Sequence, residues 1–224
     1  MMKNIRLMML MALLTIVGNA SADELVISDL NIKAGETKTI SIELNNPDND
    51  YIAFEFSLRL PDGISIVTDE NDLFVASFNN ERSSDHTLDV SKENTDGCYH
   101  FLGYSLSNKS IKGKSGEIIS LTVKCADDAE AGNYTGKAYE LIFSNSNFVE
   151  VDLTDSSFGI NVIAPGDANG DGSVSVADAV AVVNYLLNNG STDGNFVFEA
   201  ADIDGSGTIT AADAHGIVRI ILNQ

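Results

Sequence analysis

The feature that most constrains this 224-residue chain is a glycine-rich acidic stretch, GDANGDGSVSVAD, which returns 35 residues later as ADIDGSGTITAAD. At that offset Asp167 and Gly172 correspond to Asp202 and Gly207. Acidic side chains this close together repel one another unless a cation lies between them. A repeat that preserves its polar spacing indicates two copies of one structural unit.

Each copy has the spacing of a twelve-residue calcium loop, with oxygen-bearing residues at positions 1, 3, 5, 7, 9 and 12 and glycine at position 6. Oxygen ligands without nitrogen or sulfur favour Ca²⁺ over zinc or copper. Position 12 is Asp in both copies, where calcium loops usually have Glu. We therefore predict two Ca²⁺ per chain, held by Asp167, Asn169, Asp171, the Ser173 carbonyl and Asp178 in loop one, and by Asp202, Asp204, Ser206, the Thr208 carbonyl and Asp213 in loop two.

An apolar run follows each loop with residues at i, i+3, i+4 and i+7, which predicts a helix after each loop. The stretches FGINVIAPG and STDGNFVFEAA, which precede the loops, lack this pattern. Each unit is therefore predicted to be a calcium loop with an exiting helix, which is half of an ordinary EF-hand.

Residues 166–224 resemble a type I dockerin, the duplicated calcium-binding module of cellulosome proteins. The resemblance rests on the two loops, on Asp at position 12, on the YLLN helix end and on the 35-residue spacing. It implies two antiparallel helices and a face that docks a cohesin domain. Family members commonly choose their cohesin through loop positions 10 and 11, which makes the expected partner-binding residues Val176, Ala177, Ala211 and Ala212.

Residues 23–163 have the pattern of an antiparallel β-sandwich. TKTISIELNN, YIAFEFSLRL and IISLTVKC alternate apolar and polar residues, and Gly, Asn, Asp and Ser clusters separate eight or nine such runs. ISIELNNPDNDYIAFEFSLRLPDGISI and IKGKSGEII resemble the cohesin-like and carbohydrate-binding-module superfamily of jelly-roll sandwiches. The expected fold is thus a β-sandwich followed by a small all-α dockerin, residues 164–224.

The first 22 residues have the pattern of a signal peptide, with Lys3 and Arg6 before an apolar run and Ala20-Ser21-Ala22 at its end. Cleavage after Ala22 would release a secreted protein, located outside the cell or at its surface through a partner. No later segment is apolar enough to span a membrane. In that oxidising environment Cys98 and Cys125 are expected to form a disulfide, the alternative being two buried free thiols.

Composition and motifs argue against several classes of function. A formal net charge of −20 argues against a nucleic-acid partner. No nucleophile elbow or Cys/His pair is present, so we predict no catalytic residues. Three functions remain: a non-catalytic adaptor, a carbohydrate-binding module on a dockerin, and a small glycoside-active enzyme. The adaptor is favoured, because the chain has no Trp and few Tyr to build a polysaccharide platform.

Overall fold

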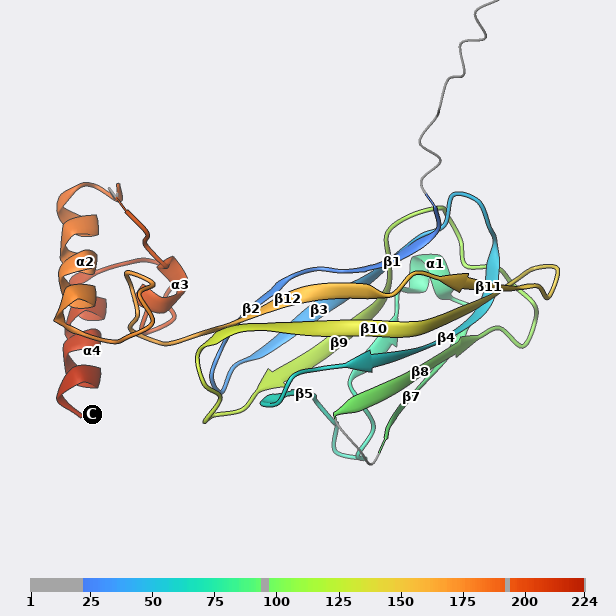
Figure 1. Ribbon diagram of the computed structural model, residues 1–224, viewed down its shortest axis with the longest axis horizontal. Helices are drawn as coiled ribbons and strands as arrows, with labels where there is room; N and C mark the ends of the chain where they lie inside the picture. The colour runs from blue at the N-terminus through green and yellow to red at the C-terminus, as the bar shows by residue number, and fades with distance from the viewer. Residues whose placement is uncertain (1–21, 94–96, 192–193, 224) are drawn as a thin grey trace, which may run out of the picture.

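The computed structural model describes residues 22–93, 97–191 and 194–223. Two β-sheets stack face to face, and a helical segment lies beyond one end of them, joined to β12 (Figure 1). The predicted signal peptide, except for Ala22, falls outside the described residues. No helix in the described ranges has both the length and the apolar character needed to cross a membrane.

The two sheets differ in size, and the order of strands within each is set by pairing between strands far apart in the chain. The smaller sheet has the order β1 (Glu24–Ile27), β3 (Thr37–Asn45), β9 (Glu117–Cys125), β5 (Ile64–Ile66), with β6 (Ala76–Phe78) also on β9. The larger has the order β2 (Leu30–Lys33), β12 (Ser156–Ile163), β10 (Gly132–Asn145), β4 (Tyr51–Arg59), β8 (Cys98–Tyr104), β7 (Thr87–Lys92), with β11 (Glu150–Leu153) also on β10. The pairing of β2 with β12 is parallel.

The predicted sandwich is confirmed, with corrections in detail. The three strands expected from strict alternation are β3, β4 and β9. The described residues form more strands than the eight or nine expected, because short ones such as β5 carry too few residues to give a period. A single helical turn, α1 (Asn80–Ser83), also lies within the sandwich segment, where no helix was expected.

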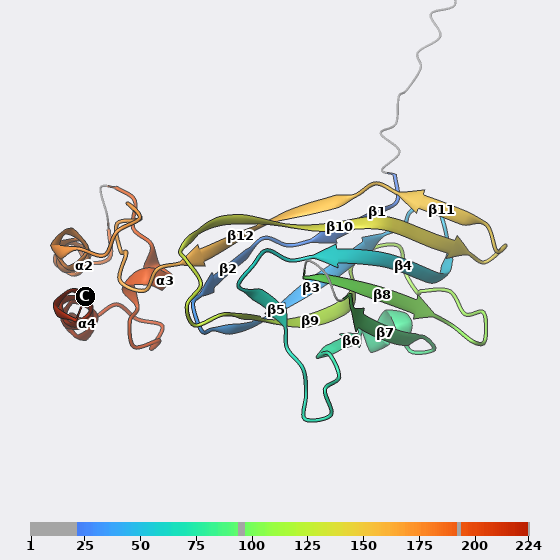
Figure 2. The same ribbon diagram turned by 60° about the horizontal axis from the view of Figure 1, so that its bottom comes forward.

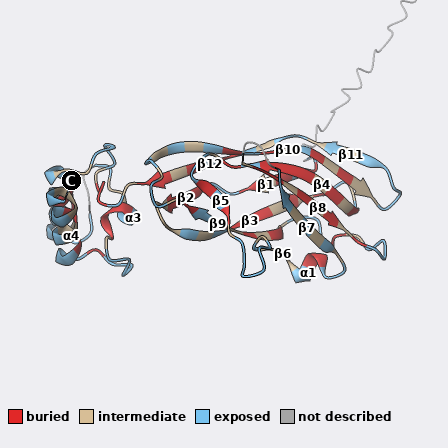
Figure 3. Cartoon of the chain, turned by 90° about the horizontal axis from the view of Figure 1, so that it is seen from below, coloured by how far each residue is buried: buried red, intermediate tan, exposed pale blue. Residues whose placement is uncertain are grey.

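The core lies between the sheets, where one face of most strands is buried; β6, β7 and β11 contribute only half-buried residues (Figure 3). In β4 the alternating residues Phe54, Phe56 and Leu58 are at most 2% exposed. Phe56 stacks on Phe101 of β8 with ring centroids 4.8 Å apart. Burial of this alternating apolar face is what holds the two sheets together.

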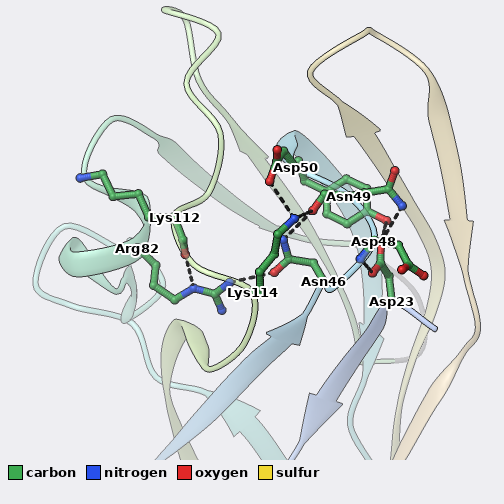
Figure 4. A network of polar contacts seen from close by, with 9 residues as sticks. Asp23, Asn46, Asp48, Asn49, Asp50, Arg82, Lys112 and Lys114 are labelled. Atoms are coloured by element: carbon green, nitrogen blue, oxygen red, sulfur yellow. Dashed lines mark hydrogen bonds and ion pairs between the residues drawn. The ribbon is translucent and has the colours of Figure 1, made fainter. Parts of the chain in front are cut away.

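A polar network at the end of the sandwich holds Asp23, the residue before β1, in place (Figure 4). The Asp23 carboxylate accepts hydrogen bonds from the Asp48 N–H, the Asn49 amide and the Tyr51 hydroxyl, the last at 2.7 Å. Nearby, the Arg82 guanidinium donates to the carbonyls of Leu44, Lys112 and Gly116 and to the Asn46 side chain. Because each buried charged group has partners, the network can lie inside the fold.

The two cysteines are free and buried. Cys98 lies on β8 of the larger sheet, where its Sγ is 3.0 Å from the Tyr139 hydroxyl. Cys125 ends β9 of the smaller sheet. The structure therefore contains two buried thiols in place of the expected disulfide, because Cys125 belongs to the core between the sheets and Cys98 does not, contacting Tyr139 instead.

Beyond β12 the helical segment has its own small core. Helices α2 (Val176–Leu187) and α4 (Ala211–Leu222) form where the apolar pattern predicted a helix after each loop. They lie side by side (Figures 1 and 2). A single turn, α3 (Phe198–Ala201), leads into loop two, so the expectation that no helix precedes this loop is wrong. The buried residues of this core are Ala168, Ala179, Val182, Ala201, Ile209 and Ile217.

Candidate metal centre

Loop one folds around the carboxylate of Asp167. Its Oδ1 accepts from the Asp171 N–H at 3.1 Å and its Oδ2 from the Gly172 N–H at 2.9 Å. Asp171 in turn accepts from the backbone and hydroxyl of Ser173. These bonds bend the chain back on itself, so that the predicted ligands of loop one come from one tight turn.

Loop two repeats this arrangement around Asp202. Its carboxylate accepts from the N–H groups of Ser206 at 3.0 Å and Gly207 at 2.9 Å. Carboxylate oxygens of Asp202, Asp204 and Asp213 all lie within 4.8 Å of one another. Three carboxylates this close provide a hard, negatively charged oxygen site, which is the donor set that Ca²⁺ prefers.

The Asp at position 12 belongs both to its loop and to the following helix. Asp178 Oδ1 accepts from the Asn169 N–H at 3.0 Å, and Oδ2 accepts from the Ser175 N–H at 2.8 Å. Ser175 is the N-cap of α2, and together these residues form a capping box. Asp213 and Thr210 do the same for α4. The short Asp side chain therefore reaches its own helix cap, and each loop closes tightly on it.

Both glycines at position 6 have left-handed backbone conformations, with φ of +89° at Gly172 and +77° at Gly207. Nothing lies within 4 Å of the place where a Cβ would be. The glycine is needed for its positive φ, which other residues adopt only with strain, and not for space.

Burial and hydrogen bonding oppose each other at the loop carboxylates. Asp178 and Asp213 are fully buried, and Asp167 and Asp202 nearly so. Burial works against ionisation of Asp213, but hydrogen bonds from Thr210 and Ile203 outweigh it and hold the pKa of this carboxyl below its ordinary value. Bonds from Ser173 and Asn169 likewise lower the pKa of Asp171. The residues thus fit a cation site, because several carboxylates are gathered in each loop, with Asp171 and Asp204 on its exposed side.

The two loops are not identical. At position 5, loop one has the Asp171 carboxylate, and loop two has the Ser206 hydroxyl, which donates to the Thr208 carbonyl at 3.1 Å. Expected ligands contact each other in both loops, since in loop one the Asn169 amide donates to the Asp171 carboxylate at 2.9 Å. At position 8, Val174 and Ile209 pack into the small helical core, and Ile209 is the more buried of the two.

The expected partner-binding residues lie at the first turns of the helices, where Val176, Ala177, Ala211 and Ala212 are all exposed. The structure adds Val180, Val183 and Leu187, which continue from Val176 along α2. Val176, Val180, Val183 and Leu187 follow one another along α2 and are 65%, 50%, 43% and 74% exposed. On α4, Val218 and Leu222 are exposed at equivalent places, and His215 replaces Val180. Apolar residues therefore line the outer as well as the inner side of both helices.

The histidines of the sandwich do not form an acid–base pair with a nucleophile among the described residues. His86 packs its ring against Phe78, and burial lowers its pKa. His100 lies on the outer face of β8, with its Nε2 3.9 Å from Glu55. Neither arrangement resembles a catalytic triad.

Comparison with known proteins agrees with this geometry. Residues 165–222 match the family model of the dockerin type I domain. No curated protein matches the chain.

Solved structures match the other part of the chain. A type I cohesin–dockerin complex from Clostridium thermocellum is 12% identical, covers 63% of this chain and 99% of its own, and has a TM-score of 0.50. A cohesin in complex with a dockerin from Acetivibrio cellulolyticus is 13% identical, with the same coverage and TM-score. At this identity the match identifies the fold alone. The chain therefore joins a β-sandwich with the cohesin fold to a segment, residues 165–222, that matches the type I dockerin family.

Proposed function

We propose that this protein is a secreted, non-catalytic adaptor whose residues 164–224 dock to a cohesin domain in a calcium-dependent manner. Residues 23–163 form its second module, and residues 1–22 are its signal peptide. The observation that carries the docking proposal is the exposed apolar stripe of α2, from Val176 to Leu187. Exposed apolar stripes of this kind, on an otherwise acidic module, mark protein interaction surfaces.

Two Ca²⁺ ions belong to this proposal, one in each loop. Over residues 164–224 eight acidic residues face a single basic one, Arg219, which is a net charge of −7. Two Ca²⁺ ions reduce this to −3. Asp178 belongs to both loop one and the first turn of α2, so calcium binding sets where Val176 and Ala177 point.

A cohesin is the partner class that the comparisons support. The similar solved structures from Clostridium thermocellum and Acetivibrio cellulolyticus are complexes of a cohesin with a dockerin. Small side chains at Ala177, Ala211 and Ala212 allow a flat sheet face to approach closely and lose little side-chain entropy on binding.

The sandwich supplies a second surface in this proposal, and a polysaccharide is not its favoured ligand. Exposed aromatic rings in a row on one sheet face would favour a polysaccharide. In the described strands the Tyr and Phe rings are buried or half-buried. The outer face of β4 and β8 instead presents Glu55 and His100, which suit a polar partner.

Binding to immobilised type I cohesins, and capture from the native secretome, test the docking proposal. We expect the double variant Ala177→Glu/Ala212→Glu to bind calcium normally and to lose the partner by at least about a hundredfold, because buried unpaired charge is costly at an interface. Each single variant should retain most binding, since the other copy of the repeat can be presented. Ser191→Glu, an exposed change between the repeats, is the control. Capture that is the same in all variants and with chelator present would exclude the helices as the docking face.

A further inference from the structure

A lysine of the sandwich contacts loop two of the C-terminal segment. Lys33 ends β2, and its Nζ donates a hydrogen bond to the main-chain carbonyl of Asp202 at 2.9 Å. The two residues are 169 positions apart in the chain. Lys33 is half-buried and Asp202 is only 7% exposed, so this contact lies at a seam between the two parts of the molecule.

Asp202 is the first residue of loop two, and its side chain is already engaged in shaping that loop. Its two carboxylate oxygens accept from the N–H groups of Ser206 and Gly207. Its backbone is the C-cap of α3, where the chain turns from helix into loop. A bond to its carbonyl from outside the segment therefore restrains the backbone from which the first carboxylate ligand extends.

Neighbouring contacts support the bond between Lys33 and Asp202. The Lys33 N–H donates to Glu36 at 2.8 Å, which holds the turn after β2 in place. Lys38, on the other side of that turn, has its Nζ 3.9 Å from Glu199 of α3. Two lysines of the sandwich thus face an acidic segment, and opposite charges favour this orientation.

Loop one meets the sandwich differently. A cavity of about 300 Å³ lies between them, lined on the sandwich side by residues that include Asn133 and Asn161 and on the loop side by Asp167 and Gly172. Loop one follows β12 after residues 164–166 and otherwise faces the sandwich across this space, and loop two, distant in the chain, is bonded to the sandwich through Lys33. The two loops differ in how far the sandwich can influence them.

We propose that Lys33 is a positioning residue for Asp202, so that loop two is completed across the boundary between the sandwich and the C-terminal segment. This inference rests on the proposed calcium sites. Restraining Asp202 raises calcium affinity at loop two, and calcium binding at loop two in turn fixes the orientation of the sandwich, because linkage between two equilibria is reciprocal. The ammonium charge acts in the opposite direction by repelling a cation, so the sign of the effect is informative.

The test uses the chain from Asp23 to Gln224, with CaCl₂ as the titrant. The amide signals of Gly172 and Gly207 in nuclear magnetic resonance spectra report on loops one and two separately. For Lys33→Met we expect calcium to bind about fivefold more weakly at Gly207 and unchanged at Gly172, as suits the loss of one charge-assisted hydrogen bond at a partly solvated seam. Lys33→Arg keeps the donor and should restore most of the affinity. Lys109→Met, an exposed lysine in the loop after β8, is the matched control.

Backbone relaxation gives a second readout that a change in affinity alone would not move. With calcium the wild-type sandwich and helices should tumble as one body, and in Lys33→Met they should tumble separately. An unchanged or tighter Gly207 titration in Lys33→Met, with common tumbling retained, would overturn the inference and leave the calcium sites standing. If neither glycine of the wild type responds to calcium, the calcium proposal fails and the inference fails with it.

Discussion

The sandwich and the C-terminal segment are stabilised by different means. In the sandwich, large apolar residues from both sheets form one continuous core, and charged groups such as Arg82 are buried only with several partners. The C-terminal segment buries few apolar residues, most of them small, together with four carboxylates, those of Asp167, Asp178, Asp202 and Asp213. The sandwich can therefore fold by burying apolar surface. We expect the C-terminal segment to need a cation to balance its buried charge.

Calcium removal is the change with the largest expected effect. A chelator should abolish most of the helical circular dichroism from α2 and α4, because their first turns are built on Asp178 and Asp213. The β signal and the unfolding temperature of the sandwich should remain. Restoring excess calcium is the control. Helices that persist without calcium would contradict the view that the C-terminal segment depends on a cation.

A substitution in the sandwich core should destabilise the sandwich and leave calcium binding unchanged. Phe56 is fully buried and stacks on Phe101, so Phe56→Ala should lower the free energy of unfolding of the sandwich by about 3–5 kcal/mol. Calcium affinity should not change. Denaturant unfolding followed by β-sheet circular dichroism measures the first quantity and calorimetry the second. Val218→Ala, on an exposed helix face, is the control for a small change; a fall in calcium affinity in Phe56→Ala while the sandwich remains folded would mean that the two parts are coupled by more than the Lys33 contact.

The same comparison explains which parts of the molecule could be predicted from sequence. Strands β3, β4 and β9 were predictable because each has nine residues with one buried face. The three-residue strands β5 and β6 are too short to give a period, and the parallel pairing of β2 with β12 depends on residues far apart in the chain. The four residues of α3 are likewise too few to give a helical pattern.

The positions of the two loops were predictable, because calcium spacing is local and repeats once. The exposure of Val180 and Val183 was not, since a wide apolar stripe does not reveal which of its sides packs inward. The contact of Lys33 with Asp202 could not be predicted either, because it joins two separately folded parts. Whether the predicted ligands bind calcium stays a prediction.

A smaller difference is expected between the calcium affinities of the two loops. We expect loop two to bind calcium more weakly, by up to about tenfold, because Ser206 replaces a carboxylate and donates to Thr208, another expected ligand. Calorimetry on Asp178→Ala leaves loop two to be measured, and Asp213→Ala leaves loop one. A tighter site in Asp178→Ala than in Asp213→Ala would reverse the ranking.

The smallest expected effect is on how the stability of the sandwich depends on pH. Burial opposes ionisation of Asp23, but bonds from Asn49, Tyr51 and Asp48 outweigh it and lower its pKa below the ordinary value of about 3.9. The stability that this group supplies is therefore present above that value and is lost as pH falls through the lower folded pKa. Asp23→Asn should be less stable near neutral pH and should lose less stability below about pH 4. Equal slopes of stability against pH in both proteins would rule out this role for Asp23.

The position of β12 also decides how the molecule responds to mechanical load. β12 lies between β2 and β10 and leads directly into the C-terminal segment. A partner that pulls on that segment while the start of the chain is anchored draws β12 and its parallel neighbour β2 in opposite directions along their length. The hydrogen bonds between Leu30–Lys33 and Ile160–Ile163 then bear the force in shear and must break together, not one at a time. Force spectroscopy with anchors at residues 23 and 224 should therefore record two events, a weak one from the helices and a stronger one from the sandwich, and a single weak rupture would contradict this. The strand that connects the sandwich to the C-terminal segment is thus also placed to withstand tension.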